Sequence, residues 1–280
     1  MDASTVASFW GQQTSYLNFC EEDYVVTRFV AEFINTFSSF VFMVYGIYGL
    51  RQLSQKQQSG GLRSVSYWGL IGVGVCSAGY HMTLKYHTQM YEKADELSMH
   101  LLTTPLLYRI LIFQASPQRT KITGIILGTL FTIVMVVHMV MDEFILHAVT
   151  FGLAVYLIAA RTLKIIPQQV PDPSIRRSIR NIAFFGCFCF GFGYFVWLID
   201  VWACGVLIKF RHVVGLPFAF LTELHGWWHV FTAIGGYVAV AIVDLVTTGK
   251  VHEDPTKDLA WPIGPAARAI ESLKTSKKQD

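Results

Sequence analysis

Two histidines stand four residues apart in the stretch "LTELHGWWHV", residues 221 to 230. Because a helical turn takes about 3.6 residues, His225 and His229 lie one above the other on a single helix face. Two metal-binding imidazoles need this spacing, although histidines so placed also serve simply as hydrogen-bonding partners in a core. Polar groups in an apolar segment are costly and are often functional. The pair is therefore a candidate for half of a metal site.

The elements that carry these histidines are predicted to be membrane helices. The chain has 280 residues, is 53% hydrophobic and 15% charged, and has a mean hydropathy of +0.43. Apolar runs long enough for a span, which needs about 20 residues, recur along it. Since lipid satisfies no backbone groups, we expect an all-α, seven-transmembrane helix bundle. The predicted spans are 30–51, 65–86, 96–114, 122–141, 144–161, 179–208 and 219–246.

The distribution of Lys and Arg predicts the orientation of this bundle. The side that holds the N-terminus carries four of them, against sixteen on the other side. By the positive-inside rule, the N-terminus is lumenal and the C-terminus cytosolic. The formal net charge of +3 is an average over two different faces and does not indicate nucleic-acid binding. We expect a lumenal segment at 1–29, a seven-helix domain at 30–247 and a mobile cytosolic tail at 248–280, with at most a short interfacial helix at 266–274.

Three predicted spans bring further polar residues to the depth of the histidine pair. His81 lies near the end of the second span, with Ser77 four residues before it, and Asp95 lies at the start of the third. Three histidines on tetrahedral zinc leave a fourth position for water, as in hydrolytic sites. Asp95 suits the role of a general base and Ser77 that of a donor to an oxyanion. Alternatively, Asp95 is only an acid favoured by the helix dipole, and Ser77 a small residue at a helix contact.

Other polar residues give weaker signals. Asp200, inside a span, should have a buried partner, structural or next to the metal site. Arg109 and Asp244, near the cytosolic span ends, are expected to extend toward water. The remaining histidines have no partner at ligand spacing or no clear geometry; they are His87, His100, His138, His147, His212 and His252.

Two of the five cysteines fall on the predicted lumenal side, Cys20 before the first span and Cys204 near the end of the sixth. A disulfide between them would be permitted in that oxidising compartment. Two unpaired thiols are the alternative that the residues alone leave open. The other three cysteines lie within spans, where packing is the simplest interpretation.

Several motifs together resemble the alkaline ceramidase family of seven-helix intramembrane zinc amidases. They are "WGQQTSYLNFCEEDYVVTRFVAEFINT" (10–36), "HMTLKY" with "DELSM" (81–99), "WLIDVWAC" (197–204) and "HGWWHVFTAIGGY" (225–237). The likeness runs in order over about residues 10 to 247. The wider superfamily includes adiponectin-type receptors, which share the Ser, Asp and three-His pattern, but the N-terminal motif is similar to the ceramidase branch.

The resemblance implies roles for individual residues. It makes His81, His225 and His229 the zinc ligands, Ser77 and Asp95 the catalytic pair, and Cys20 with Cys204 a lumenal disulfide. It also implies an N-terminal calcium site, whose matching positions are Asn18, Phe19 through its backbone carbonyl, Glu21, Asp23 and Glu32. Clustered carboxylates are the hard oxygen ligands that calcium requires, although an acidic segment without calcium has the same composition.

The sequence departs from the family pattern in two places. Asn18 replaces the usual Asp, which removes one negative charge from the calcium site. Fourteen positions lead from His81 to Asp95, three more than is usual, as if residues 91–93 were inserted. In a loop they would leave Asp95 at the head of the third span; within the helix they would rotate it by about 300°. We expect Asp95 to keep its role, because the residues after it match.

The resemblance thus implies hydrolysis of the amide of ceramide or phytoceramide to a sphingoid base and a fatty acid, in the endoplasmic reticulum or Golgi membrane. Zn²⁺ would be catalytic and Ca²⁺ structural or regulatory. Two alternatives share this architecture. One is a receptor or scaffold with a structural zinc, and the other is a hydrolase of a different lipid, such as a glycerolipid ester.

Overall fold

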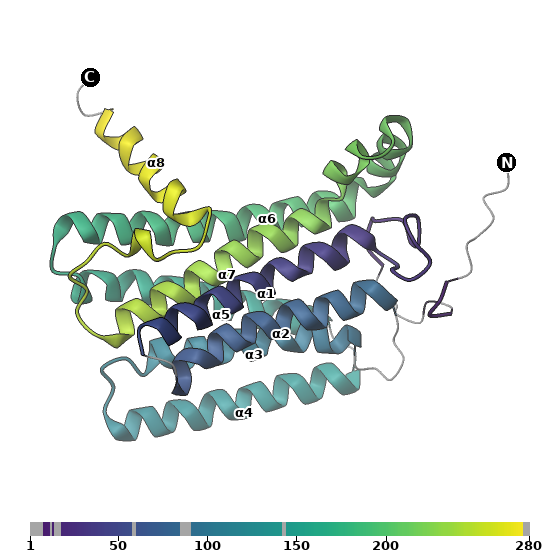
Figure 1. Cartoon of the computed structure of the whole chain (residues 1–280). Coiled ribbons are helices and arrows are strands. Elements are labelled where there is room, and N and C mark those ends of the chain that lie inside the picture. Colours follow the sequence, from purple (N-terminus) through teal and green to yellow (C-terminus); the bar gives the residue numbers. More distant parts are fainter. Residues whose placement is uncertain are drawn as a thin grey trace, which may run out of the picture.

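The computed structural model describes residues 8–11, 13, 18–57, 60–84, 91–141 and 144–276; His87 lies outside them. Within these ranges the chain folds into eight α-helices and two short 3₁₀ helices (Figure 1). The all-α class predicted from the sequence is confirmed. In chain order the elements are α1 (Phe33–Gln55), α2 (Gly61–Thr83), α3 (Tyr91–Leu111), α4 (Pro117–Met141), α5 (Phe144–Gln169), α6 (Pro173–Val214), η1 (Phe218–Thr222), α7 (Leu224–Thr248), η2 (Pro255–Lys257) and α8 (Ile263–Ser276).

The long helices α1 to α7 pack side by side in one bundle, and α8 lies at one end of it (Figure 1). Helix α7 is central: it packs mainly against α6 and α1 and also touches α2, α3 and α5. Helix α4 is peripheral, because Met135 and His138 are its only buried residues in the described part of the chain. The core that positions the site is therefore built from α1, α2, α6 and α7.

Among the described residues, five helices are long and apolar enough to cross a membrane: α1, α4, α5, α6 and α7. Large apolar side chains such as Ile125, Val140 and Trp202 lie exposed on the outer faces of the bundle. A contiguous apolar exterior would be a liability in water but matches the hydrocarbon of a bilayer. The bundle is thus a membrane protein, while the number of seven spans and the orientation stay predictions.

Helix α6 is much longer than a membrane span. It begins with a capped turn, in which the Asp172 carboxylate accepts hydrogen bonds from the backbone N–H groups of Ser174 (2.7 Å) and Ile175 (3.1 Å), with Pro173 at its first position. Its 42 residues extend about 63 Å at about 1.5 Å per residue, roughly twice a 30 Å hydrocarbon core. One end of α6 must therefore project beyond the bundle, as Figure 1 shows near the N-terminal segment.

Small residues bring the helices of the site into close contact. A Cβ atom at Gly74 of α2 would lie 2.9 Å from the backbone oxygen of Ser39 in α1. At Gly226 of α7 it would lie 2.7 Å from the Ile34 side chain of α1. Side chains cannot approach so closely, and close backbone approach through small residues is how membrane helices gain packing energy. These two glycines set α2 and α7 tightly against α1.

The bundle end opposite to the N-terminal segment contains a buried ion network. The Asp244 carboxylate accepts hydrogen bonds from Arg63 (2.6 and 2.8 Å) and from Arg109 (3.0 Å). Arg109 and Asp244 were expected to extend separately toward water, and this expectation is wrong. They lie on facing helices, so each neutralises the other inside the protein at a lower cost than exposure to lipid would impose.

The tail at 248–280, which is predicted to be mobile, contacts the bundle in its described part. Val251 donates its N–H to the carbonyl of Gln169 (2.9 Å), and the hydroxyl of Tyr45 donates to the carbonyl of Trp261 (3.0 Å). Ile263 and Ala267 are buried against the bundle. The apolar residues interspersed in this charged stretch bring its described part back against the bundle, while its mobility stays a prediction.

Candidate metal centre

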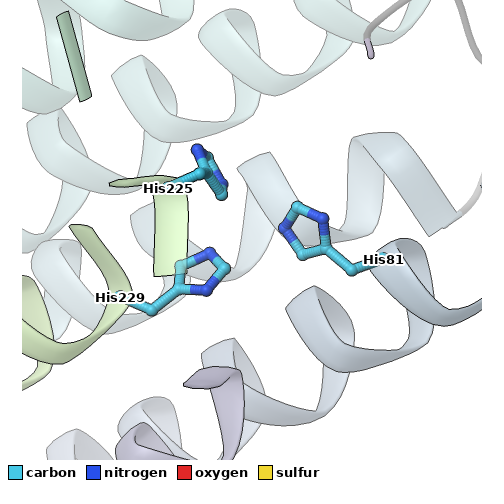
Figure 2. A group of neighbouring side chains, drawn as sticks. All are labelled: His81, His225 and His229. Carbon is cyan, nitrogen blue, oxygen red and sulfur yellow. The ribbon is translucent and has the colours of Figure 1, made fainter. Parts of the chain in front are cut away.

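Three histidines meet inside the bundle at the end near the N-terminal segment. His81 comes from the last turn of α2, and His225 and His229 from the first two turns of α7 (Figure 2). One nitrogen from each lies within 4.8 Å of those of the other two. The ring centroids are 4.6 to 5.1 Å apart, and all three residues are buried. The structure thus brings together the three residues that the sequence singled out.

The nitrogens of this triad fit a metal ion. Nε2 of His81 and Nδ1 of His225 have no hydrogen-bond partner among the described residues. Nδ1 of His229 lies 2.8 Å from the Ser38 hydroxyl, which leaves Nε2 of that ring facing the group. Unsatisfied buried nitrogens are costly unless they bind something. Three imidazole nitrogens are a typical donor set for zinc with one position left open.

Glu32 contacts one ring nitrogen of His81 and leaves the other available to a metal ion. Its carboxylate contacts Nδ1 of His81 and is completely buried. It also accepts hydrogen bonds from the Asn35 side chain (3.2 Å) and from the backbone N–H of Phe19 (3.3 Å). A carboxylate on the far nitrogen of a metal-binding histidine fixes the tautomer and makes the ring a better ligand. The family resemblance implied only a calcium-site role for Glu32 and gave no sign of this contact.

Ser77 lies beside the triad. Its Oγ is 3.5 Å from Nε2 of His229 and 3.0 Å from Oγ of Ser39, and it is buried. Ser38 and Ser39 were not identified from the sequence, although they follow Asn35 by three and four residues and so share its helix face. The hydroxyl of Ser77 is therefore placed to donate a hydrogen bond to a group bound at the triad.

Asp95 occupies the second turn of α3 and is half-buried. Its carboxylate is near enough to act electrostatically on the thiol of Cys76, which directly precedes Ser77. Asp95 does not belong to the group of converging donors found among the described residues. Residues 91–93 form the first turn of α3 instead of part of a loop. Asp95 therefore lies in the second turn of α3 and not at its head, and its catalytic role stays a prediction.

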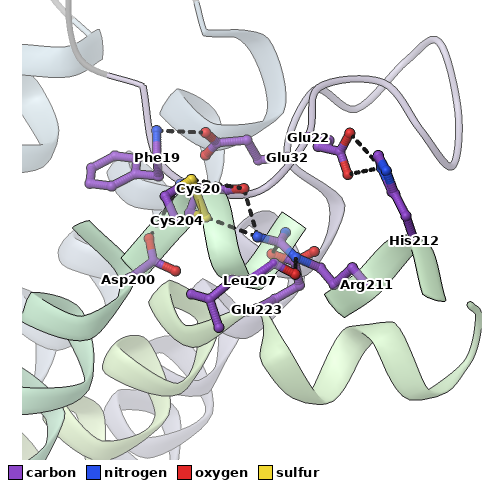
Figure 3. Close-up of a disulfide and its surroundings, with 10 residues drawn as sticks. All are labelled: Phe19, Cys20, Glu22, Glu32, Asp200, Cys204, Leu207, Arg211, His212 and Glu223. Atoms are coloured by element: carbon purple, nitrogen blue, oxygen red, sulfur yellow. Dashed lines mark hydrogen bonds and ion pairs between the residues drawn. A yellow bond between two sulfur atoms is a disulfide. The ribbon is translucent and has the colours of Figure 1, made fainter. Parts of the chain in front are cut away.

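The N-terminal segment is fastened to the bundle close to the triad (Figure 3). Cys20 forms a disulfide with Cys204 of α6. Arg211 donates to the backbone carbonyl of Cys20 (2.9 Å) and pairs with Glu223 (2.5 Å). The ring of Phe19 is thereby held 3.8 Å, centroid to centroid, from that of His225. The segment covers one side of the three histidines.

Asp200 completes this fastening. Its carboxylate accepts the backbone N–H of Cys20 (3.3 Å) and lies close to the backbone of Leu224 and His225 at the start of α7. The N–H groups in the first turn of a helix have no partner within the helix. The buried partner expected for Asp200 is thus structural: the residue joins the N-terminal segment to the helix that carries two of the histidines.

The five candidate calcium ligands differ in their contacts. Glu21 accepts hydrogen bonds from the backbone N–H groups of Ile34 (2.6 Å) and Asn35 (2.8 Å) and so caps α1. Asn18 is exposed and its side chain lies close to the carboxylate of Asp23, whose Oδ1 has no hydrogen-bond partner within the described ranges.

Burial, with the negative charge of Glu32 nearby, raises the pKa of Glu21 to about 7 and that of Asp23 to about 6. Crowding of carboxylates that repel one another is what a divalent cation would relieve.

The fold and the site together define a class: a polytopic helical membrane protein with a buried three-histidine group capable of binding metal. The sequence matches the Ceramidase family over residues 11–268, and the chain belongs to this family. It is 28% identical over 252 residues to alkaline ceramidase YPC1 of Saccharomyces cerevisiae, covering 86% of this chain and 79% of the relative. It is 30% identical over 265 residues to alkaline ceramidase 3 of Mus musculus, covering 92% and 93%.

Proposed function

We propose that this protein is a zinc-dependent intramembrane amidase that hydrolyses ceramide or phytoceramide to a sphingoid base and a free fatty acid. The observation that carries the proposal is the convergence of His81, His225 and His229 in a buried position. Family membership and the names of the relatives support the substrate class. The chains of the lipid would lie among the helices with the amide at the triad.

The three histidines would hold the zinc ion, with Glu32 orienting His81. When bound, zinc supplies Lewis-acid chemistry that lowers the pKa of water toward neutrality and polarises a carbonyl group. Glu32 and Ser38, which contact the outer nitrogens of His81 and His229, keep both rings in the tautomer that binds metal.

Hydrolysis adds one water molecule across the amide bond. Asp95 is assigned the proton transfers: it takes a proton from the attacking water and gives it to the nitrogen as the C–N bond breaks. Ser77 donates a hydrogen bond to the carbonyl oxygen as that oxygen becomes negative. The electrostatic effect of Asp95 on Cys76, the neighbour of Ser77, supports this pairing.

Calcium is assigned to the N-terminal segment, with Asn18, the carbonyl of Phe19, Glu21, Asp23 and Glu32 as its ligands. There it would stabilise the segment over the triad. The proposed organisation is a lumenal segment at 1–29, the seven-helix catalytic domain at 30–247 and a cytosolic tail at 248–280, in the endoplasmic reticulum or Golgi membrane. The excess of Lys and Arg on the side of the membrane opposite to the N-terminus supports this orientation.

The decisive experiment measures sphingoid base released from ceramide by purified wild type and by His225→Ala. His212→Ala is the matched control, because His212 is exposed and pairs with Glu22 away from the triad. We expect release by the wild type and by the control and none by His225→Ala. Equal release by all three would refute a catalytic role for the triad. A panel with glycerolipid esters separates ceramide hydrolysis from that of another lipid.

One observation favours a second candidate, a receptor or scaffold with a structural metal. The carboxylate of Asp95 is not among the donors that converge with the histidines in the described part of the chain. Metal removal distinguishes the two functions. A structural ion would be needed for thermal stability, whereas a catalytic ion would be lost with the fold retained and turnover abolished.

A further inference from the structure

Helix α6 carries a stripe of exposed apolar side chains that is longer than the hydrocarbon core of a membrane. Spacings of four and seven residues keep its members on one helix face. Each is at least 50% exposed; they are Phe184, Phe188, Phe195, Trp202, Val206 and Val213. At about 1.5 Å per residue, the stripe extends about 44 Å from its first to its last member, whereas a hydrocarbon core is about 30 Å thick.

The first end of the stripe lies at a membrane boundary. The guanidinium carbon of Arg180 is 5.9 Å from the ring centroid of Phe184, and Arg176 and Arg177 precede it on α6. Arginine is costly in hydrocarbon and belongs at or beyond the end of a span. A typical tilt of about 20° shortens the stripe only to about 41 Å, which leaves an excess of about 11 Å. This excess lies at the other end of α6, beside the N-terminal segment.

At that end the apolar exposure continues from the last turns of α6 into η1. Six side chains there are each at least 50% exposed; they are Val206, Phe210, Val213, Leu216, Phe218 and Leu221. We call these six residues the α6–η1 surface. Figure 1 shows this end of α6, with η1, directed sideways from the bundle near the N-terminal segment. An apolar surface of this kind is a liability in water and marks an interaction site.

The opposite side of the same segment is polar and already has its partners. Arg211 is buried on the face of α6 turned away from Val213, where it pairs with Glu223 and donates to the carbonyl of Cys20 (2.9 Å). The disulfide from Cys204 fixes the helix to the same place. The polar groups thus lie inward and the apolar ones outward, which is the reverse of the arrangement in water and is typical of a segment in contact with lipid.

We infer that the α6–η1 surface is embedded in the interfacial layer of the leaflet next to the N-terminal segment. The occupant of this surface is therefore the same bilayer that surrounds the bundle. The surface is continuous with the outer face of α6, which already lies against lipid. The length of the stripe, about 41 to 44 Å, equals the thickness of a bilayer with its headgroup layers, about 40 to 45 Å.

Two side chains indicate a shallow depth for the α6–η1 surface. Lys209 is exposed and lies seven residues after Trp202, on the same helix face. Its long stem lets the ammonium group reach the headgroups only if the helix is close to them. Tryptophan is itself enriched in the interfacial layer. Because η1 leads directly into α7, contact with lipid would hold the helix start that carries His225 at a fixed depth. The inference does not depend on the proposed amidase activity.

Fluorescent labels at single cysteines test the inference on the full chain in phosphatidylcholine nanodiscs, where both bilayer faces are open to solvent. Cys76, Cys187 and Cys189 are replaced by Ala, and the disulfide is kept. An environment-sensitive label is then attached at Val213→Cys or Phe218→Cys. Two quenchers are compared: iodide in the water, and phosphatidylcholine with a nitroxide near the top or the middle of its acyl chain.

Two exposed positions outside the surface provide the controls. Leu130→Cys lies midway along α4 on its outer face, and Asp258→Cys lies in the tail. We expect the labels at positions 213 and 218 to be quenched by the lipid nitroxides, more strongly by the upper one, and several-fold less by iodide than the label at 258. The label at 130 should respond more strongly to the middle nitroxide. Unchanged helical circular dichroism confirms the fold of each variant.

Other outcomes would overturn the inference. Labels at 213 and 218 that respond to iodide like the label at 258, and to neither nitroxide, would place the α6–η1 surface in water. The same labels are also measured in vesicles at high and low protein density. Loss of nitroxide quenching at high density would mean that a second copy of the chain, and not lipid, covers the surface.

Discussion

Replacement of Glu32 by Gln should weaken zinc binding at the triad, although Glu32 is not one of the three ligands. The carboxylate is completely buried and contacts Nδ1 of His81. Gln retains the size of the side chain and an oxygen that can accept from Asn35 and Phe19. It removes the negative charge that makes the His81 ring a stronger ligand. The perturbation is therefore electronic and local.

The expected magnitude follows from the loss of one carboxylate partner of a metal-binding histidine. Such a loss typically weakens metal affinity about 10-fold to 100-fold, which corresponds to about 1.4 to 2.7 kcal/mol. The zinc dissociation constant is measured by competition with a chelator, with and without calcium. Glu22→Gln is the matched control, because Glu22 is more exposed and pairs with His212 at the surface. Its zinc affinity should equal that of the wild type.

The reasoning would be refuted by a zinc affinity of Glu32→Gln within about twofold of the wild type, a difference of about 0.4 kcal/mol. If calcium binding were lost in the same variant, Glu32 would belong to the calcium site alone. If zinc affinity also falls in calcium-free buffer, the loss does not depend on calcium and arises from the contact between Glu32 and His81. The two measurements together distinguish a role of Glu32 as a calcium ligand, which the resemblance implies, from its contact with His81, which the structure shows.

Three other predictions test the fold and the N-terminal segment. Asp244→Ala leaves the buried Arg109 without its partner beside the half-buried Arg63 and should lower stability by about 3 to 5 kcal/mol. Asp258→Ala removes only an exposed pair and should cost about 1 kcal/mol or less. Both are measured by thermal unfolding in detergent. Cys20→Ser should lower stability by about 2 to 5 kcal/mol, while Cys187→Ser, at an exposed free thiol, should have little effect. Asn18→Asp adds a charged oxygen beside Asp23 and should tighten calcium binding, measured by titration calorimetry.

Each of these predictions has an outcome that contradicts it. Equal thermal midpoints for Asp244→Ala and Asp258→Ala would mean that the arginines find water or another partner. A Cys20→Ser variant as stable as Cys187→Ser would mean that Arg211 and Asp200 hold the segment without the covalent bond. Unchanged calcium affinity in Asn18→Asp would exclude that side chain as a ligand.

The sequence predicts the helical class and the pairing of His225 with His229 well, because both follow from the periodicity of a single helix. His81 could be predicted as a third member of the site, because the alternating direction of the spans places the end of α2 at the depth of His225 and His229. The contact between Glu32 and His81 could not be predicted, since it depends on the path of the chain from Phe19 to Phe33. The contact between Glu96 and His138 could not be predicted either, since α3 and α4 become neighbours only when the bundle packs.

The ends of the elements were less predictable for a similar reason. Hydropathy locates the part of a helix that lies in lipid and is insensitive to polar turns that continue it, so α6 was predicted to end at 208 and reaches Val214. The tail was expected to be mobile from its charge. Its contacts with the bundle could not be predicted, because a contact such as that between Tyr45 and Trp261 joins residues 216 positions apart.

The bond between Cys20 and Cys204 turns most of the molecule into a covalent ring, because 184 positions separate the two cysteines. A single cut in any connection between α1 and α6 would leave one molecule, which falls into two pieces only on reduction. His81 lies within the ring, whereas His225 and His229 lie on the chain outside it. The candidate metal centre is therefore assembled across the point where the ring closes.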